Sequence, residues 1–292
     1  MGKPKVLFVY DHKYPHLWRD GLWAALKMLE KDFEIKWLNL DTAWNPSLNP
    51  IVIEECDFIL GWGGFRSKVD SYIEIFKNYY PQVKTGLCLG GYASPAVGRA
   101  YNYDILFYET EWSKKWIEEN ALKSFVRPEE VNLIHAFGIN SKIYNPGKHN
   151  YYGAIFDEII YDYLSVGSFS YWKRQNLMLD KKGYRMVIGE IQKENYAESM
   201  DIISSLIAGG VAVSDMVEPK TLADIYRASK KVYIPAEEMG GGERAVLEAR
   251  ACGVPVEIMY DNKKLFELLT CPVWDEVYYK NQLKKGILEC LK

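Results

Sequence analysis

The first half of the chain alternates short apolar runs with segments whose apolar residues recur at helical spacing. Residues 5–10 (KVLFVY) and 56–61 (CDFILG) are apolar enough for buried strands, and residues 21–31 (GLWAALKMLEK) form an amphipathic helical pattern. The same patterns predict strands at 33–40, 83–89, 104–108 and 131–136, and helices at 68–79 and 113–120. Because strands separated by helices require crossover connections, this half is expected to form a parallel α/β sheet.

The alternation restarts after a turn-rich segment at residues 145–150 (NPGKHN). Strands are predicted at 163–166, 184–189, 211–214, 231–235 and 254–259, and helices at 196–208, 219–229, 243–252 and 261–269. We therefore expect an N-terminal Rossmann-like domain over residues 1–148, a second one over 149–274, and an amphipathic helix at the C-terminus, 275–292. Ligands of open α/β sheets bind beyond the carboxyl ends of the strands, so a cleft between two such domains is the expected site.

Composition places the chain among ordinary globular proteins. Its 292 residues are 48% hydrophobic and 26% charged, which argues against disorder and collagen-like repeats. With 36 Lys and Arg against 39 Asp and Glu, the formal net charge is -3, which argues against a constitutive nucleic-acid coat but leaves room for a local basic patch. The 9 Trp and 22 Tyr suit stacking or sugar contact as well as packing.

Compartment and metal chemistry follow from what the sequence lacks. The five cysteines form no C-x-x-C pair, so we expect reduced thiols and neither a disulfide framework nor a zinc site. No apolar segment follows a basic one at the N-terminus, and no run approaches the length of a membrane span. The sequence therefore predicts a cytoplasmic protein with no membrane insertion.

The most informative stretch is 235–255, PAEEMGGGERAVLEARACGVP. A predicted strand ends at Pro235, three glycines follow, and a strong helix-forming sequence begins near Glu243. Glycines before a helix let a phosphate approach the backbone, and the helix N-terminus offers unpaired N–H groups and a partial positive charge. Arg244 lies in the first turn, where its guanidinium suits a bidentate phosphate contact, and Glu248 one turn later suits ribose hydroxyls.

This stretch resembles the C-terminal signature of retaining nucleotide-sugar glycosyltransferases of the GT-B fold, the large family 4. That signature reads roughly E-G-F-G-x-x-x-x-E-A-x-A-x-G-x-P-V, and residues 247–256 (LEARACGVPV) match its second half. The resemblance implies that Glu248 holds the ribose and that Gly240, Gly241 and Gly242 lie beneath the diphosphate. The family's first Glu falls on Gly240, so Glu238 or Glu243 would take its role toward the sugar hydroxyls.

Two further segments resemble the same family. Residues 138–146 (GINSKIYNP) match its interdomain segment G-[IV]-[DN]-x-x-x-[FY]-x-P, and 166–174 (VGSFSYWKR) resemble V-G-R-x-x-x-x-K-G after a strand. The resemblance puts Lys173 on the diphosphate-binding lysine and Ser168 on the family's Arg, for which Arg174 would substitute. It also implies donor contacts from Gly167, a loop with Ser214 and Met216 against the nucleobase, and a last helix that crosses back onto the N-terminal domain.

The N-terminal domain of this family recognises the acceptor. The loop after the first predicted strand, residues 11–21 (DHKYPHLWRDG), is dense in donors, acceptors and aromatic rings. Its candidates are His16 for catalysis and, for acceptor binding, His12, Trp18, Arg19 and Asp20. The first strand is not followed by G-x-G-x-x-G, which argues against a dinucleotide-binding dehydrogenase.

We therefore expect a retaining glycosyltransferase of the hexosyltransferase type. Its donor is expected to be a nucleotide-diphospho-sugar, and among these a UDP-sugar is favoured. The sequence has no D-x-D triplet, and no essential metal or other cofactor is expected. Glycans, lipids, small molecules and a hydroxymethylated base in DNA all stay open as acceptors. The chain is short for this fold, as are compact phage and viral enzymes, which would act in the host cytoplasm. The alternatives are a sugar-nucleotide epimerase on the same fold and a catalytically silent nucleotide-sugar-binding module.

Overall fold

A computed structural model gives the structure of the protein and describes residues 2–13, 21–43, 55–90, 99–121, 131–151, 154–156 and 159–292. The chain divides into two compact units. The first takes in the N-terminal strand, Leu22–Phe137 and Glu276–Lys292, and the second takes in Gly138–Asp275. Among the described residues, no helix combines the length and the apolar character that crossing a bilayer requires.

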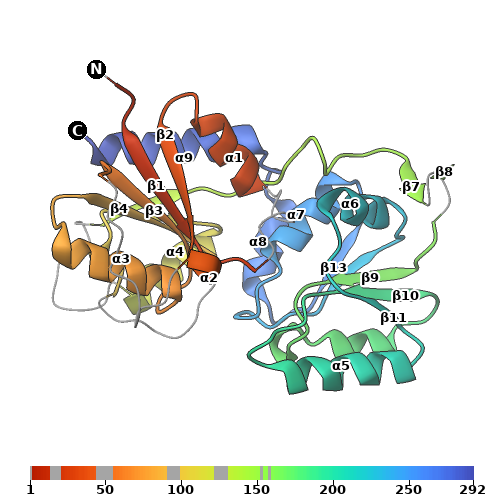
Figure 1. Cartoon of the computed structure of the whole chain (residues 1–292). Coiled ribbons are helices and arrows are strands. Elements are labelled where there is room, and N and C mark those ends of the chain that lie inside the picture. The colour runs from red at the N-terminus through yellow and green to blue at the C-terminus, as the bar shows by residue number, and fades with distance from the viewer. Residues whose placement is uncertain are drawn as a thin grey trace. The chain divides into compact units, whose positions relative to one another are not determined.

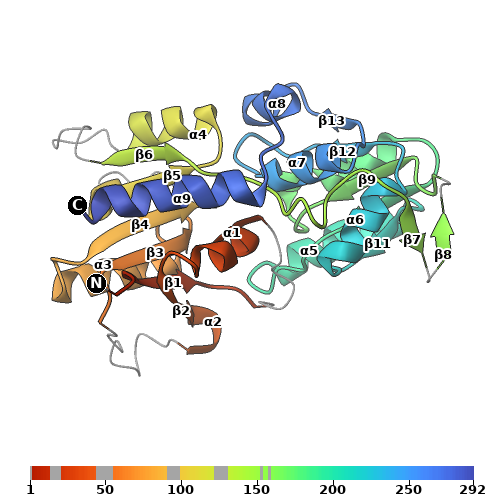
Figure 2. The same ribbon diagram turned by 90° about the horizontal axis from the view of Figure 1, so that it is seen from above.

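The first unit is built on a six-stranded parallel sheet with the strand order β2-β1-β3-β4-β5-β6 (Figures 1 and 2). Its strands are β1 (Lys5–Tyr10), β2 (Glu34–Asn39), β3 (Phe58–Gly63), β4 (Lys84–Leu89), β5 (Ile105–Tyr108) and β6 (Asn132–His135). Its helices are α1 (Gly21–Leu29), α2 (Leu40–Ala43), α3 (Lys68–Tyr79), α4 (Glu111–Trp116) and α9 (Glu276–Cys290), with a 3₁₀ turn at Arg99–Asn102 and a π turn at Ile117–Ala121.

Helices cover both faces of this sheet because its strands are apolar on both sides. In β1, Phe8 and Tyr10 enter a core shared with α1 and α9, while Leu7 and Val9 enter the opposite core with α3. A strand buried on both faces reads as a continuous apolar run, which is the pattern that KVLFVY shows.

The last helix, α9, belongs to the first unit and lies along its sheet (Figure 2). Tyr279, Leu283 and Ile287 are buried in the core that α1 also lines. At Gly286 an added Cβ would collide with Ile105 of β5, so this glycine lets the helix approach the strands closely.

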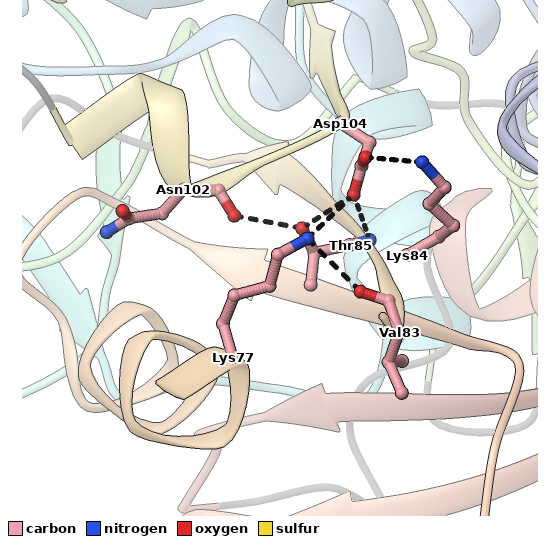
Figure 3. A network of polar contacts seen from close by, with 6 residues as sticks. All are labelled: Lys77, Val83, Lys84, Thr85, Asn102 and Asp104. Carbon is pink, nitrogen blue, oxygen red and sulfur yellow. Dashed lines mark hydrogen bonds and ion pairs between the residues drawn. The ribbon is translucent and has the colours of Figure 1, made fainter. Parts of the chain in front are cut away.

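A polar network connects α3 to the N-terminal ends of β4 and β5 (Figure 3). Asp104, just before β5, accepts hydrogen bonds from the Thr85 N–H at 2.8 Å and from Lys77 and Lys84 Nζ at 3.1 Å each. Lys77 also donates to the Val83 carbonyl, and the Thr85 hydroxyl donates to the Asn102 carbonyl. Burial raises the pKa of Asp104, but these donors and ammonium groups outweigh it and leave that pKa below its ordinary value.

The second unit has a five-stranded parallel sheet with the order β11-β10-β9-β12-β13 and a small antiparallel hairpin, β7-β8. The strands are β7 (His149–Tyr151), β8 (Ala154–Phe156), β9 (Tyr163–Val166), β10 (Arg185–Ile188), β11 (Ala212–Ser214), β12 (Val232–Ile234) and β13 (Val256–Ile258). The helices are α5 (Tyr196–Ala208), α6 (Pro219–Arg227), α7 (Glu243–Ala251) and α8 (Lys263–Thr270), with 3₁₀ segments at Tyr171–Lys173 and Gln175–Asp180.

The chain enters the second unit at Gly138, whereas composition placed the boundary near residue 148. The Ile139 N–H donates to the Trp274 carbonyl at 3.0 Å, and Ile139 pairs with Asp275 in a parallel bridge. Further along, the Tyr144 ring packs edge-on against Tyr226 of α6. These contacts tie 138–144 to the second unit, so the Pro- and Gly-rich segment lies within this unit.

Candidate functional site

The candidate site lies at the point where the sheet of the second unit reverses its winding. From β9 the chain winds outward through β10 to β11, then returns to place β12 on the other side of β9. In open α/β sheets this switch point, at the carboxyl ends of the strands, is where ligands bind. The loop that begins at Gly167 follows β9, and the loop that begins at Pro235 follows β12, so both border this point.

These two loops are fastened to each other by backbone contacts. The Glu237 N–H donates to the Trp172 carbonyl at 2.9 Å, and an added Cβ at Gly240 would collide with that same carbonyl oxygen. The fully buried Asn262 donates through Nδ2 to the Ala236 and Glu237 carbonyls at 2.9 and 3.0 Å. The loop after β12 is therefore held from both sides.

The glycine run adopts backbone conformations that other residues disfavour. Gly241 has φ of 74° and Gly242 has φ of 113°, and Gly242 is the N-cap residue of α7, where it has no side chain to bond the helix N–H groups. An added Cβ on Gly242 would lie 2.7 Å from Ile234 Cγ2 of β12. The run thus leads the chain closely past the sheet and directs the N-terminus of α7, with its partial positive charge, at the switch point.

Lys173 lies over this arrangement. Its side chain passes Gly167, where an added Cβ would be 3.3 Å from Lys173 Cδ, and its Nζ would be 3.0 Å from an added Cβ on Gly241. Burial lowers the pKa of Lys173 to about 8, with Glu243 acting against this shift and Lys264 and Arg244 adding to it. The structure therefore brings Gly167, Lys173 and Gly241 together. A bound anion would stabilise the charged form of Lys173 there.

Glu243, the first residue of α7, is buried and forms an ion pair with Lys264 of α8. Glu243 Oε1 lies 2.5 Å from Lys264 Nζ, and the Lys264 side chain has no exposed surface. Burial raises the pKa of Glu243, but Lys264 and Lys173 outweigh it and hold that pKa below its ordinary value. The carboxylate therefore stays charged beside two ammonium groups.

Glu238 differs from Glu243 in its surroundings. Its Oε1 is buried, and among the described residues it has no hydrogen-bond partner. Because a buried carboxylate oxygen without a donor is costly, this atom is suited to receive one from a bound molecule.

Arg174 directs its charge at carboxylates of the protein. Its Nε donates to Glu237 at 3.0 Å and its Nη1 donates to Asp261 at 2.6 Å. Its backbone is left-handed, with φ of 48°, which is uncommon for a residue with a side chain. Arg174 thus joins the loop after β9 to the loops after β12 and β13.

Glu248 is buried farther along α7. Its Oε2 accepts a hydrogen bond from the Tyr226 hydroxyl of α6 at 3.1 Å. Tyr226 itself is fully buried, and burial together with Glu248 raises its pKa well above the ordinary value. The hydroxyl therefore stays protonated and acts as a donor that fixes the carboxylate.

The remaining residues predicted for the donor lie on neighbouring loops. Ser168 is half-buried directly after Gly167. Ser214, at the end of β11, donates from its hydroxyl to the Asp215 carbonyl at 3.0 Å, and the Met216 N–H donates to Asp215 Oδ1 at 2.7 Å. Ser214 also accepts from the Gly189 N–H through its carbonyl, which joins the ends of β10 and β11.

Of the residues predicted for the acceptor, the structure describes His12. Its backbone exchanges two hydrogen bonds with the Asn39 side chain, at 3.2 and 3.0 Å, so the chain leaving β1 is tied to the end of β2. His16, Trp18, Arg19 and Asp20 lie outside the described residues. Nearby, Asp11 forms an ion pair with Lys68 at 3.6 Å.

Sequence reasoning overlooked three residues that support this site: Asn262, Lys264 and Tyr226. Asn262 carried a usable signal, because Asn directly before a helical segment and after a strand is a typical N-cap, and its Oδ1 does accept the Leu265 N–H at 3.1 Å. Lys264 and Tyr226 gave no such signal, since their partners are distant in sequence.

Metal coordination has no evident basis in the part of the chain that the structure describes. There, no group of three or more His, Cys, Asp or Glu side chains is arranged to hold a metal ion. The expectation that activity needs no metal stays a prediction.

Comparison with known proteins finds solved structures that resemble this protein. No protein-family model and no curated protein matches the chain. Among solved structures, Anabaena Alr3699/HepE in complex with UDP and glucose matches with a TM-score of 0.67 and 13% identity, over 98% of this chain and 100% of that chain. Sucrose-phosphate synthase from Thermosynechococcus elongatus matches with a TM-score of 0.61 and 12% identity, over 99% and 90%.

An epimerase also shares the architecture. UDP-GlcNAc 2-epimerase from Neisseria meningitidis bound to UDP-GlcNAc matches with a TM-score of 0.52 and 12% identity, over 98% of this chain and 91% of that chain. At such identities the likeness concerns the fold. The chain has an α/β fold of two parallel-sheet units that matches GT-B glycosyltransferase structures, as its sequence motifs predicted.

Proposed function

We propose that this protein transfers a sugar from a UDP-sugar to an acceptor hydroxyl, with retention of configuration at the anomeric carbon. The observation that carries the proposal is the switch point of the second unit, where Lys173 lies between Gly167 and Gly241 at the N-terminus of α7. Backbone N–H groups, a helix N-terminus and an ammonium group together suit a diphosphate. The solved structures with bound UDP and glucose add support from a shared fold.

The residues predicted for the donor each have a role in this proposal. Lys173, Arg244 and the backbone of Gly240–Gly242 hold the diphosphate, with Gly167 and Ser168 beneath it. Glu248 receives the ribose hydroxyls, while the loop with Ser214 and Met216 lies against the nucleobase. Glu238 accepts from a sugar hydroxyl, which its buried oxygen without a partner supports. Arg174 acts indirectly, by holding the loops through Glu237 and Asp261.

The chemical step proposed here takes place on one face of the sugar. The bond from the anomeric carbon to the diphosphate oxygen breaks, the acceptor oxygen bonds to the same face, and the acceptor proton passes to the leaving phosphate. Such a step needs no side-chain nucleophile. It depends on stabilising the charge that develops on the diphosphate, which preorganised cations and N–H groups do well.

The acceptor is expected at the first unit, near the loop after β1 that contains His12 and His16. Glycans, lipids, small molecules and hydroxymethylated DNA remain candidates. For the DNA case, hydroxymethylated and unmodified duplexes are incubated with labelled donor at two salt concentrations. Binding through phosphates must weaken as salt rises, and failure to label hydroxymethylated DNA with common donors removes this acceptor.

The proposal is tested in two steps. Thermal-shift measurements with UDP-, GDP-, ADP- and dTDP-sugars identify the donor, because a ligand that binds the folded state raises its apparent stability. Transfer to an acceptor panel is then followed with and without EDTA. A stabilising donor that is neither hydrolysed nor transferred would indicate a silent binding module, and loss of transfer in EDTA with recovery in Mg²⁺ or Mn²⁺ would overturn the metal-free mechanism.

A sugar-nucleotide epimerase is the second candidate, favoured by the structural match to an enzyme bound to UDP-GlcNAc. Epimerisation needs acid and base groups that face the sugar ring. Incubation with UDP-GlcNAc in D₂O without an acceptor separates the two functions. An epimerase would produce the 2-epimer with deuterium at C2, while a transferase would leave that carbon unexchanged.

A further inference from the structure

The donor site proposed above contains a buried lysine that no sequence motif singled out. Lys264 comes from α8, next to the Asn262 that caps this helix, and its side chain is fully buried. Its Nζ lies 2.5 Å from Glu243 Oε1. A buried charge is tolerated when it is paired, so Lys264 and Glu243 depend on each other.

The same carboxylate also faces the site. Glu243 Oε2 would lie 3.4 Å from an added Cβ on Gly241, and Lys173 Nζ would lie 3.0 Å from that same point. Lys264, Glu243 and Lys173 thus follow one another from the interior of the unit to the glycine run. The charged groups that act on the Lys173 ammonium are Glu243 and Arg244 of α7 and Lys264 of α8.

We propose that Lys264 is a positioning residue for the diphosphate contact: by holding Glu243 it keeps that carboxylate from neutralising Lys173, and so leaves the Lys173 ammonium available to phosphate. This inference rests on the proposed function for the identity of the anion. Its electrostatic part concerns only these three side chains and has a test of its own.

Lys264 and Lys173 compete for one carboxylate. With Lys264 present, Glu243 is shared between two ammonium groups, and the positive neighbours disfavour the charged form of Lys173. Without Lys264, Glu243 would pair with Lys173 alone. That pairing raises the pKa of Lys173 but competes with a bound diphosphate for the same ammonium.

The test compares four variants with the wild type. They are Lys264→Met, Glu243→Gln, the double variant with both changes, and Lys263→Met as a matched control at an exposed neighbouring lysine. Acetic anhydride labelling across a pH series, read on the Lys173 peptide by mass spectrometry, reports the Lys173 titration without any ligand. Calorimetry with UDP reports the contact to the diphosphate.

The midpoint of Lys173 labelling is expected to move to higher pH in Lys264→Met and to lower pH in Glu243→Gln, and to stay unchanged in Lys263→Met. UDP affinity should fall about tenfold in Lys264→Met, the scale of one charge-assisted hydrogen bond. The double variant should bind UDP more tightly than Lys264→Met, because the competing carboxylate is gone. The double variant also replaces a buried ion pair by neutral groups, which proteins often tolerate. It can therefore be measured even if a single variant does not fold.

An unchanged labelling midpoint in Lys264→Met and Glu243→Gln would overturn the inference, and so would a double variant that binds UDP no better than Lys264→Met. If wild-type protein does not bind UDP while the midpoints still move as expected, the proposed function fails and the coupling of the three side chains stands.

Discussion

The surroundings of Lys173 disfavour its ammonium group in the free protein, and they favour the binding of an anion beside it. Burial takes its ammonium out of water, and Lys264 and Arg244 add repulsion, so its pKa is lowered from 10.5 to about 8. A bound diphosphate would reverse the balance. Sites that are costly when empty are a recognised source of conflict between stability and function.

Replacement of this lysine should therefore move stability and binding in opposite directions. Lys173→Met is expected to raise the melting temperature of the free protein and to weaken UDP binding about a hundredfold, since it removes a desolvated charge and a phosphate contact together. Scanning calorimetry and titration calorimetry measure the two effects. A melting temperature that falls along with the affinity would show that Lys173 supports the fold instead.

The pH dependence of binding follows from the same group. Lys173 is protonated below pH 8 and becomes neutral as pH rises through about 8, so UDP affinity should decline over this interval. Lys173→Met should remove this decline while any change from other groups remains. A wild-type affinity that is constant between pH 7 and about 9 would contradict the assignment of Lys173 to the diphosphate.

Glu248 offers a second test at the level of single residues. If its carboxylate receives the ribose hydroxyls, Glu248→Ala should weaken UDP binding by about 10–100-fold, or ~1.5–3 kcal/mol for charge-assisted hydrogen bonds. The Tyr226→Phe variant is the control, because it removes the donor to Glu248 and keeps the carboxylate. Titration with 2′-deoxy-UDP makes the comparison specific: Glu248→Ala should bind UDP and 2′-deoxy-UDP alike, and a preserved preference for UDP would exclude the ribose role.

At the scale of elements, the approach of α7 to β12 depends on the glycine run. Gly242 combines a left-handed backbone with a close approach to Ile234, whereas Gly253, after the same helix, has φ of 79° and room for a Cβ, which would meet Pro146 Cβ at an ordinary contact distance of 4.0 Å. The two glycines therefore separate backbone strain from steric contact.

Gly242→Ala should destabilise the protein more than Gly253→Ala. We expect a loss of about 1 kcal/mol at Gly253 from the left-handed backbone alone, and about 2–4 kcal/mol at Gly242, where Ile234 must also move. Urea denaturation measures both changes. Equal losses in the free energy of unfolding would mean that Ile234 of β12 moves to accommodate the added methyl group at little cost.

At the scale of the whole molecule, the C-terminal helix and the proposed donor site belong to different units. The C-terminal helix α9 completes a core of the first unit, and Leu283 is fully buried there with α1 and the sheet. The residues proposed for the donor site, in contrast, all belong to the second unit.

A cavity in the first unit should therefore leave donor binding intact. Leu283→Ala is expected to lower the free energy of unfolding by about 2–5 kcal/mol, while the UDP dissociation constant of the folded protein stays within about twofold of wild type. Leu288→Ala, on the exposed side of α9, is the control for stability. A large loss of UDP affinity in folded Leu283→Ala protein would show that the two units are coupled.

The regular elements could be predicted from the sequence because their signals are local. The periodicity of residues 196–208 and the apolar run KVLFVY gave α5 and β1 with their observed bounds. The β7-β8 hairpin was missed because Pro, Gly and Asn near residue 147 suggested a linker, and antiparallel pairing depends on the partner strand. At the site, glycine spacing indicated the loop before α7, but the pairing of Glu243 with Lys264 depends on how α7 and α8 pack.

The side chain of Asn262 gives the site a built-in reporter. It accepts the Leu265 N–H at the start of α8 and donates to the carbonyls of Ala236 and Glu237. Opening of the loop after β12 would release this amide group, so protection of the Leu265 N–H against hydrogen–deuterium exchange tracks how often the loop opens. A molecule that settles on that loop should slow exchange at Leu265, a position buried behind it. The amide of one leucine can thus register occupancy of a site that it does not touch.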